Sequence, residues 1–160
     1  MSNVGNINLI TVCTNVYPML YVHKLVNCFM QLTKLNVSAY CITDRPNDLP
    51  AGCRPIPSDP ESKGWWNKME MFSPTMPKGW NVYLDIDTFL LNNFDEEIEW
   101  VISKKPNIAC VGDAVEWMDC RFSSSMMIFE AGSQESIYFK YQDIKSELQD
   151  LIGGDQVWMG

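Results

Sequence analysis

Two aspartates that are one residue apart are the residues whose type and spacing most directly indicate chemistry. Asp85 and Asp87 follow an apolar run that begins at Asn81, and the apolar pattern resumes after them. Side chains two residues apart in a β-strand point to the same side, so a strand over 81–87 would place both carboxylates together. Adjacent carboxylates repel each other unless a cation lies between them, and oxygen ligands suit Mg²⁺ or Mn²⁺. The pair predicts a metal–diphosphate site, although a strand that ends in an Asp-containing turn explains it equally well.

The composition favours one folded domain and excludes several classes of protein. The 160 residues are 46% hydrophobic, which predicts a single domain over 1–160 with a sizeable core. A net charge of -8 without a cluster of Lys and Arg argues against a nucleic-acid partner. No apolar stretch reaches the roughly 18 residues of a membrane span, and the N-terminus lacks the features of a signal peptide. We therefore expect a cytoplasmic protein.

The cysteines are expected to be reduced. Six are present, without a CxxC pair, and Cys13 and Cys41 lie in apolar, strand-like runs. A free cysteine in such a run packs as a small hydrophobic residue, which is a better interpretation than a disulfide or a zinc ligand.

The hydrophobic pattern predicts strands that alternate with helices. Strands are expected over 7–13, 37–43, 81–87, 108–111 and 125–129, and helices over 18–34 and 64–72, after Asp95 and after Ser133. The Pro-rich segment 46–60 is expected to be a loop with at most a short strand. This order predicts an α/β fold with a mostly parallel sheet. Such sheets bind ligands at the carboxyl ends of their strands, which is where Asp85 and Asp87 fall.

Four segments in a fixed order carry a family likeness: residues 8–15, residues 65–72, the Asp-x-Asp at 84–87, and residues 124–129 followed by 154–156. Together they resemble the GT-A glycosyltransferases that use a nucleotide sugar, and most closely the branch that contains glycogenin and bacterial galactosyltransferases. The resemblance covers most of the chain and implies a GT-A-like (Rossmann-like) sheet flanked by helices. It also implies transfer of a sugar from a nucleotide-diphosphate donor, with a uridine diphosphate sugar favoured. The acceptor, a glycan, lipid or protein, is not identified.

The resemblance assigns a metal and a nucleotide site. Asp87 would bind Mn²⁺ or Mg²⁺ directly, and Asp85 would contact both the metal and the ribose. Thr14 and Asn15 would meet the base or the ribose. A divalent cation at this position would offset the negative charge that builds on the leaving phosphate.

The resemblance also places residues around the donor sugar. Lys68 would approach the diphosphate or the sugar, and Ser125 would stand near the sugar. Asp155 and Gln156 would face the sugar hydroxyls and the reacting carbon, which makes them the candidate catalytic residues. Plainer interpretations stay open: a solvated helix cation for Lys68, a helix N-cap for Asp155, and an ordinary strand-end serine for Ser125.

The tryptophan pair at 65–66 also has two interpretations. Trp65 and Trp66 could stack on a sugar or a base, but paired tryptophans more often pack in the core or at its rim.

The sequence departs from the family pattern in two places. Met126 stands where the pattern has a glycine, which would narrow the sugar pocket. The sequence also stops at Gly160, just past Gln156, whereas family members continue with an acceptor-binding portion. The resemblance therefore implies a fragment truncated at the C-terminus, a minimal donor-binding core, or a member with only two protein ligands to the metal.

Two other classes of function remain open. The sequence from Asp85 to Thr88 also fits the nucleophile motif of haloacid-dehalogenase-like phosphatases, but that family carries the motif on its first strand, and here a β-α-β unit precedes it. The other class is a non-catalytic domain that binds a nucleotide sugar.

Overall fold

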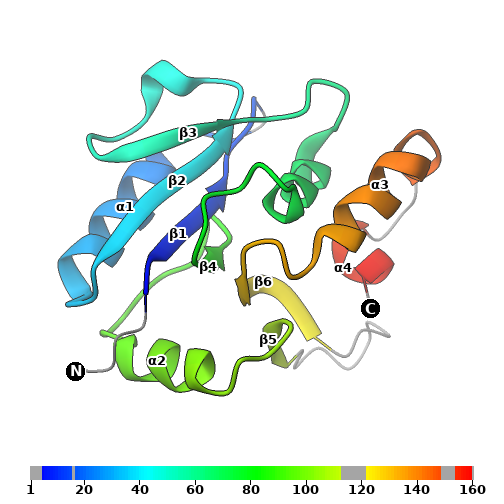
Figure 1. Ribbon diagram of the computed structural model, residues 1–160. Coiled ribbons are helices and arrows are strands. Elements are labelled where there is room, and N and C mark those ends of the chain that lie inside the picture. The colour runs from blue at the N-terminus through cyan, green and yellow to red at the C-terminus, as the bar shows by residue number, and fades with distance from the viewer. Residues whose placement is uncertain (1–4, 16, 113–121, 149–153, 160) are drawn as a thin grey trace.

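A computed structural model describes residues 5–15, 17–112, 122–148 and 154–159, and these form a mixed six-stranded sheet flanked by helices (Figure 1). The strands are β1 (Ile7–Val12), β2 (Val37–Thr43), β3 (Cys53–Pro57), β4 (Trp80–Leu84), β5 (Ala109–Gly112) and β6 (Phe122–Glu130). The α-helices are α1 (Leu20–Leu32), α2 (Asp95–Ser103), α3 (Glu135–Leu148) and α4 (Gly154–Met159), and two 3-10 helices are η1 (Pro46–Asp48) and η2 (Gly64–Phe72).

The sheet has a parallel part and an antiparallel part. Its strand order is β3-β2-β1-β4-β6-β5. The strands from β3 to β4 pair in parallel, whereas β6 runs antiparallel to both β4 and β5. The expected α/β class is therefore confirmed, and strand β4 stands where the two parts of the sheet meet.

Two core layers cover the two faces of the sheet, because neighbouring residues of each strand point to opposite sides. Leu9 and Val82 join α1 and α2 in one cluster. Ile10 and Tyr83 join η2, α3 and α4 in the other. The second layer matters for function, because it carries η2 and α4 against the sheet.

Strand β3 forms although its segment was expected to be mainly loop. Its two prolines, Pro55 and Pro57, are exposed, and β3 lies at an edge of the sheet beside β2. An edge strand tolerates proline because one side of its backbone has no ladder partner.

Strand β4 ends earlier than expected. It stops at Leu84, and Asp85 begins a turn in which the Thr88 backbone N–H donates to the Asp85 carbonyl at 3.0 Å. The prediction that one strand runs through both aspartates is therefore wrong. The alternation of side chains along a strand then does not place the two carboxylates on the same side. The backbone N–H of Asp85 still donates to the Ser125 carbonyl of β6 at 2.9 Å, which fixes where the turn begins.

The described cysteines agree with the expectation of reduced thiols. Cys13, Cys41 and Cys53 are buried, Cys28 and Cys110 are partly buried, and all five have free thiols. Cys120 lies outside the described residues. Among the helices of the described ranges, none has the length and apolar character needed to cross a bilayer.

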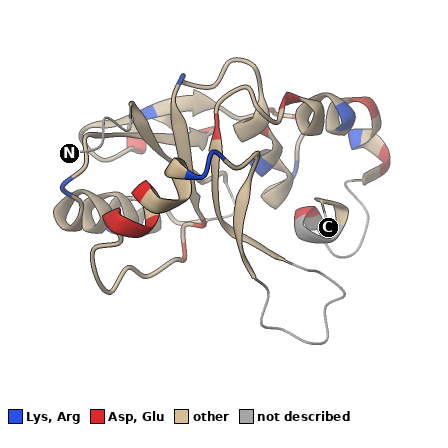
Figure 2. Cartoon of the chain, turned by 60° about the horizontal axis from the view of Figure 1, so that its bottom comes forward, with Lys and Arg blue, Asp and Glu red and all other residues tan. Residues whose placement is uncertain are grey.

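Asp95 joins the start of α2 to the end of α1. The first turn of α2 is acidic (Figure 2), and the Asp95 carboxylate accepts hydrogen bonds from Thr33 Oγ1 at 2.6 Å and from the Lys34 backbone N–H at 2.7 Å. Asn93 Nδ2 donates to it at 2.8 Å. Burial alone would raise the pKa of Asp95, but these hydrogen bonds outweigh burial and lower it.

Replacing Asp95 with asparagine should destabilise the fold by about 1–2 kcal/mol at pH 7, because charge-assisted hydrogen bonds would be lost. A carboxyl whose pKa is lowered by folding stabilises the fold fully above its ordinary pKa of 3.8 and less as the pH falls. The difference between wild type and Asp95→Asn in urea unfolding should therefore narrow below pH 3.8. A difference that is constant down to pH 2 would contradict this role.

Candidate functional site

A buried lysine joins segments that lie far apart in the sequence. Lys68, on η2, is only 5% exposed, and its Nζ lies 3.2 Å from Asp85 Oδ1 and 3.0 Å from Asp155 Oδ2. It also donates to Ser124 Oγ at 3.1 Å. Lys68 is therefore not a solvated helix cation. Asp155 lies inside α4, and its buried carboxylate pairs with Lys68 instead of capping the helix.

Tyr83 holds the first aspartate of the motif. Its buried hydroxyl donates to Asp85 Oδ1, and Lys68 Nζ lies 5.3 Å from the centre of its ring. Burial raises the pKa of Tyr83 well above 10, and the charges of Asp85, Asp155 and Asp87 raise it further, so the phenol remains a donor. Both donors reach Oδ1, and the Asp85 side chain is still 30% exposed. This leaves Oδ2 as the oxygen that can meet a ligand.

The donor set at the turn fits a hard divalent cation. Asp87 is exposed in the turn, two residues after Asp85, and its charge is one of those that raise the pKa of Tyr83. Within the described residues, no group of three or more His, Cys, Asp or Glu side chains could hold a metal ion. Mg²⁺ and similar ions are commonly held by one or two carboxylates, with water and phosphate oxygens completing the coordination. Asp85 and Asp87 therefore fit an ion that is shared with a diphosphate.

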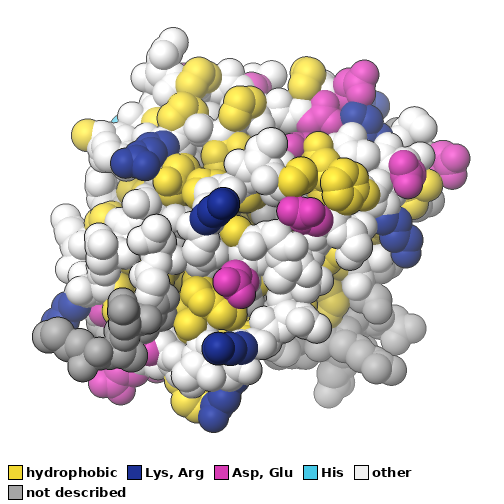
Figure 3. All heavy atoms as spheres, in the orientation of Figure 1, with side chains coloured by type: hydrophobic (Ala, Val, Ile, Leu, Met, Phe, Trp, Pro, Cys, Tyr) yellow, Lys and Arg dark blue, Asp and Glu magenta, His cyan; other side chains and the backbone are white. Residues whose placement is uncertain are grey.

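Lys68 offsets only one of the two negative charges of Asp85 and Asp155, so these three groups together stay negative. On the face shown in Figure 3, basic side chains are dispersed among hydrophobic and polar groups. A phosphate that approaches this face meets no broad positive patch. A diphosphate would be attracted to Asp85 and Asp87 only with a cation between them, because carboxylate and phosphate oxygens repel each other.

The serines of β6 divide between two roles. Ser124 points to Lys68, whereas the Ser125 and Ser123 hydroxyls share a hydrogen bond of 2.8 Å. Ser125 contributes its carbonyl to the Asp85 backbone. The structure thus brings Ser125 beside the motif through its backbone, and Ser124 reaches Lys68 because alternate residues of a strand face opposite sides.

A cavity of about 820 Å³ opens at the carboxyl ends of the parallel strands. Thr14 and Asn15 line it after β1, and Thr43 and Asp44 line it at the end of β2. The wall continues through residues 57–60 and 62–64 to Asn67 on η2. The two predicted nucleotide contacts therefore lie in one cavity, which is lined on η2 by Gly64 and Asn67 and not by Lys68 itself.

Helix α3 fastens one wall of this cavity. Lys145 Nζ lies 2.8 Å from Asp59 Oδ2 and 2.7 Å from Glu61 Oε2, both in the segment after β3. Burial alone would raise the pKa of Asp59, but hydrogen bonds from Lys145, Ser62 and the Glu61 backbone lower it. Ser62 and Tyr141 share a further hydrogen bond of 2.8 Å. The ion pairs and this bond hold the segment against α3.

Glu70 lies near this contact and is poorly suited to carry a charge. Burial, then the charge of Asp59, raises the pKa of Glu70 to about 7, against the opposing charge of Lys145. Its Oε1 is buried without a hydrogen-bond partner. Folding therefore favours the protonated carboxyl. The contribution of Glu70 to the free energy of unfolding is most favourable below pH 4.5 and is lost as the pH rises toward 7.

Replacing Glu70 with glutamine should stabilise the protein by about 1–2 kcal/mol at pH 8 and have little effect at pH 4, because glutamine stays neutral throughout. Urea unfolding at several pH values would measure this difference. Glu147→Gln, at an exposed position of the same helix that carries Lys145, is the control. An equal effect of Glu70→Gln on the free energy of unfolding at pH 4 and pH 8 would show that folding does not raise the pKa of Glu70.

The tryptophan pair separates into a core residue and a surface residue. Trp66 is 1% exposed, stacks on Tyr141 with ring centres 5.6 Å apart, and meets the edge of Trp158. Ligand stacking is therefore wrong for Trp66, which instead packs η2 against α3 and α4. Trp65 is 50% exposed.

Gln156 cannot be placed as a site residue in the same detail. Its backbone belongs to α4, directly after Asp155, and its side chain is outside the described part of the structure. Its predicted role at the reacting carbon stays a prediction.

Sequence reasoning missed three polar residues that the structure brings to the site. Tyr83 hides within an apolar strand pattern, and no sequence signal marks its hydrogen bond to Asp85. Asp44 and Arg45 do carry a signal, because they directly follow the strand predicted over 37–43. The same carboxyl-end rule that singled out the motif applies to them.

Comparisons with known proteins agree on the fold. No family model matches the sequence, and no curated protein matches it. The structure superposes on the glycosyltransferase GlyE of Streptococcus pneumoniae with a TM-score of 0.67 at 12% identity, covering 95% of this chain and 41% of that one. It also superposes on the galactosyltransferase LgtC, solved with donor and acceptor sugar analogues, with a TM-score of 0.66 at 10% identity, covering 94% of this chain and 67% of LgtC. The chain has the GT-A fold.

A more distant likeness extends this GT-A group. Mouse xyloside xylosyltransferase 1 matches with a TM-score of 0.53 at 13% identity, covering 89% of this chain and 76% of that protein. The chain thus spans less than half of GlyE and about two thirds of LgtC. At these identities, the likeness establishes the GT-A fold alone. The phosphatase interpretation fits poorly, because the Asp-x-Asp of this GT-A sheet follows β4 and not the first strand.

Proposed function

We propose that this chain binds a nucleotide-diphosphate sugar together with Mn²⁺ or Mg²⁺ and takes part in transferring the sugar. The observation that carries the proposal is the buried Lys68, held between Asp85 and Asp155 on η2, the same helix whose Gly64 and Asn67 line a cavity at the carboxyl ends of parallel strands. The GT-A fold of the glycosyltransferases supports this choice of reaction.

The proposed site has a nucleoside half and a diphosphate half. The cavity at Thr14 and Asn15 takes the base and the ribose, with a uridine diphosphate sugar favoured as the donor. Asp85 and Asp87 hold the metal, which supplies positive charge to the leaving diphosphate when it is bound. Lys68 lies against Asp85 and would donate to a phosphate or sugar oxygen by exchanging one of its three present partners for the ligand.

The proposed sugar end lies at α4. Loss of the diphosphate gives the sugar oxocarbenium-like character, which a nearby carboxylate stabilises. The contact of Asp155 with Lys68 supports the proposal that Asp155 takes this role, with Gln156 next to it in the chain and Ser125 beside the motif. The acceptor would be a glycan, lipid or protein.

Calorimetry tests the proposal directly. We expect uridine diphosphate, or failing that guanosine diphosphate, to bind in the presence of Mn²⁺ and to bind far more weakly after metal removal. Binding without sugar transfer or donor hydrolysis would support the non-catalytic alternative. No metal-dependent binding of either nucleotide would reject the proposal, and hydrolysis of a simple phosphomonoester that is lost in Asp85→Asn would favour a phosphatase.

A further inference from the structure

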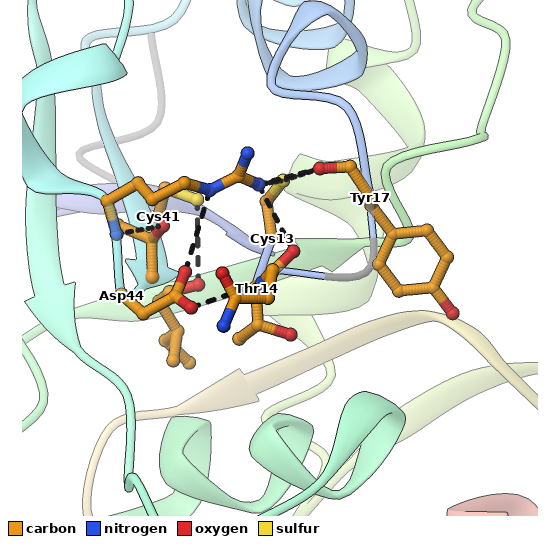
Figure 4. A network of polar contacts seen from close by, with 9 residues as sticks. Cys13, Thr14, Tyr17, Cys41 and Asp44 are labelled. Carbon is orange, nitrogen blue, oxygen red and sulfur yellow. Dashed lines mark hydrogen bonds and ion pairs between the residues drawn. The ribbon is translucent and has the colours of Figure 1, made fainter.

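The loop that follows β1 is held by an arginine from the end of β2. Arg45 Nη2 donates to the Tyr17 carbonyl at 2.6 Å and to the Thr14 carbonyl at 3.1 Å, and it lies 3.4 Å from Cys13 Sγ (Figure 4). The Thr14 carbonyl also accepts the Tyr17 backbone N–H at 3.0 Å. One guanidinium nitrogen therefore meets two carbonyl oxygens of the same turn.

A second set of contacts fixes the arginine and the neighbouring carboxylate. Asp44 Oδ2 accepts the Asn15 backbone N–H at 3.2 Å, and Asp44 Oδ1 lies 3.6 Å from Arg45 Nε (Figure 4). The Arg45 backbone N–H donates to Thr43 Oγ1 at 3.1 Å. The end of β2 thus holds the β1 loop through both its carbonyl oxygens and its N–H.

The chemistry of arginine suits this position. A guanidinium is charged at every relevant pH and presents several N–H donors in a fixed plane, whereas a lysine presents one compact ammonium. Burial raises the pKa of the Cys13 thiol, and the opposing charge of Arg45 does not reverse this, so the sulfur stays a neutral thiol. The positive charge of Arg45 is therefore directed at the carbonyl oxygens of the loop.

Arg45 does not itself line the cavity. Three residues that contact Arg45 or Asp44, or are Asp44 itself, do line it. Thr14, Asn15 and Asp44 line the cavity, and each is placed by this network. Removing the guanidinium would release the Thr14 carbonyl and take away the charge beside Asp44, which holds the Asn15 backbone N–H. The contacts among Lys68, Asp85 and Tyr83 would stay intact, because Arg45 makes none of them.

We propose that Arg45 is a positioning residue for the nucleoside half of the site. It preorganises the loop after β1, so that Thr14, Asn15 and Asp44 face the base or ribose before the ligand arrives. This inference rests on the proposed function. It predicts an effect confined to ligands that carry a nucleoside, because a free diphosphate would meet only Lys68 and the metal at Asp85 and Asp87.

Two ligands separate the halves of the site. Uridine diphosphate and pyrophosphate, each with Mn²⁺, would be titrated by calorimetry into the wild type, Arg45→Met and Arg45→Lys. We expect Arg45→Met to weaken uridine diphosphate binding about tenfold, since preorganisation and two charge-assisted hydrogen bonds are lost. Arg45→Lys should weaken it about threefold, because an ammonium can keep one carbonyl contact. Pyrophosphate binding should stay within about twofold of the wild type in both variants.

The control is Arg54→Met, because Arg54 is exposed on β3 and stacks on Tyr40 away from the loop. Nucleotide binding by Arg45→Met that equals the wild type would overturn the inference, as would an equal loss for both ligands. If Arg45→Met does not fold, Arg45→Lys carries the same comparison. A wild type that binds pyrophosphate but neither uridine nor guanosine diphosphate would reject the proposed function itself, a result distinct from the failure of Arg45 alone.

Discussion

Replacing Asp87 with alanine is expected to weaken metal-dependent nucleotide binding severely while leaving the fold intact. Asp87 is exposed in the turn after β4, so its loss removes no core contact. A metal shared with a diphosphate supplies several kcal/mol, so the affinity for uridine diphosphate in Mn²⁺ should fall on the order of 100-fold. Calorimetry with and without Mn²⁺ would measure the loss, and urea unfolding would show an unchanged stability within about 0.5 kcal/mol.

The control for this variant is Asp143→Ala, which removes an exposed carboxylate on α3 and the same formal charge. It separates loss of a ligand from a general change in net charge. If Asp87→Ala binds nucleotide and Mn²⁺ as the wild type does, Asp87 is not a metal ligand, and the turn after β4 is only a turn. If Asp87→Ala binds the nucleotide as well as the wild type does in the absence of Mn²⁺, the lost affinity in Mn²⁺ is due to the lost metal ligand.

Replacing Lys68 with methionine is expected to lower the free energy of unfolding by about 3 kcal/mol at pH 7, because breaking a buried ion pair leaves its partners uncompensated. Asp155 is buried, and Asp85 is 30% exposed, so most of the penalty should fall on Asp155. Adding Asp155→Asn to Lys68→Met should therefore recover about 1–2 kcal/mol. Urea unfolding of the two single variants and the double variant would test this coupling.

Lys24→Met, at an exposed position of α1, should change stability by no more than about 0.5 kcal/mol and serves as the matched control. If Asp155→Asn destabilises Lys68→Met further, the carboxylate has another partner and the ion pair is not what fixes α4. If Lys68→Met keeps near-native stability but no longer binds uridine diphosphate in Mn²⁺, Lys68 contributes more to ligand binding than to the stability of the fold.

The sequence by itself determined the order of the elements and the type of site. Strand 37–43 was predicted to its last residue, and the α/β class followed from apolar runs that alternate with helical spacing. These patterns are local, because the period of a helix or strand is written in neighbouring residues. The carboxyl-end rule then pointed to Asp85 and Asp87, and the family resemblance pointed to Thr14.

Only the tertiary structure decided how these residues act on one another. Lys68 belongs to a short helix and Asp155 to another near the C-terminus, and only packing on the same face of the sheet makes them an ion pair. The end of β4 at Leu84 and the burial of Trp66 likewise depend on neighbouring elements. Arg45 shows the same limit, since its partners lie in the loop after β1, about 30 residues earlier in the chain. Sequence periodicity specifies each element, but contacts between elements arise from the packing of the whole chain.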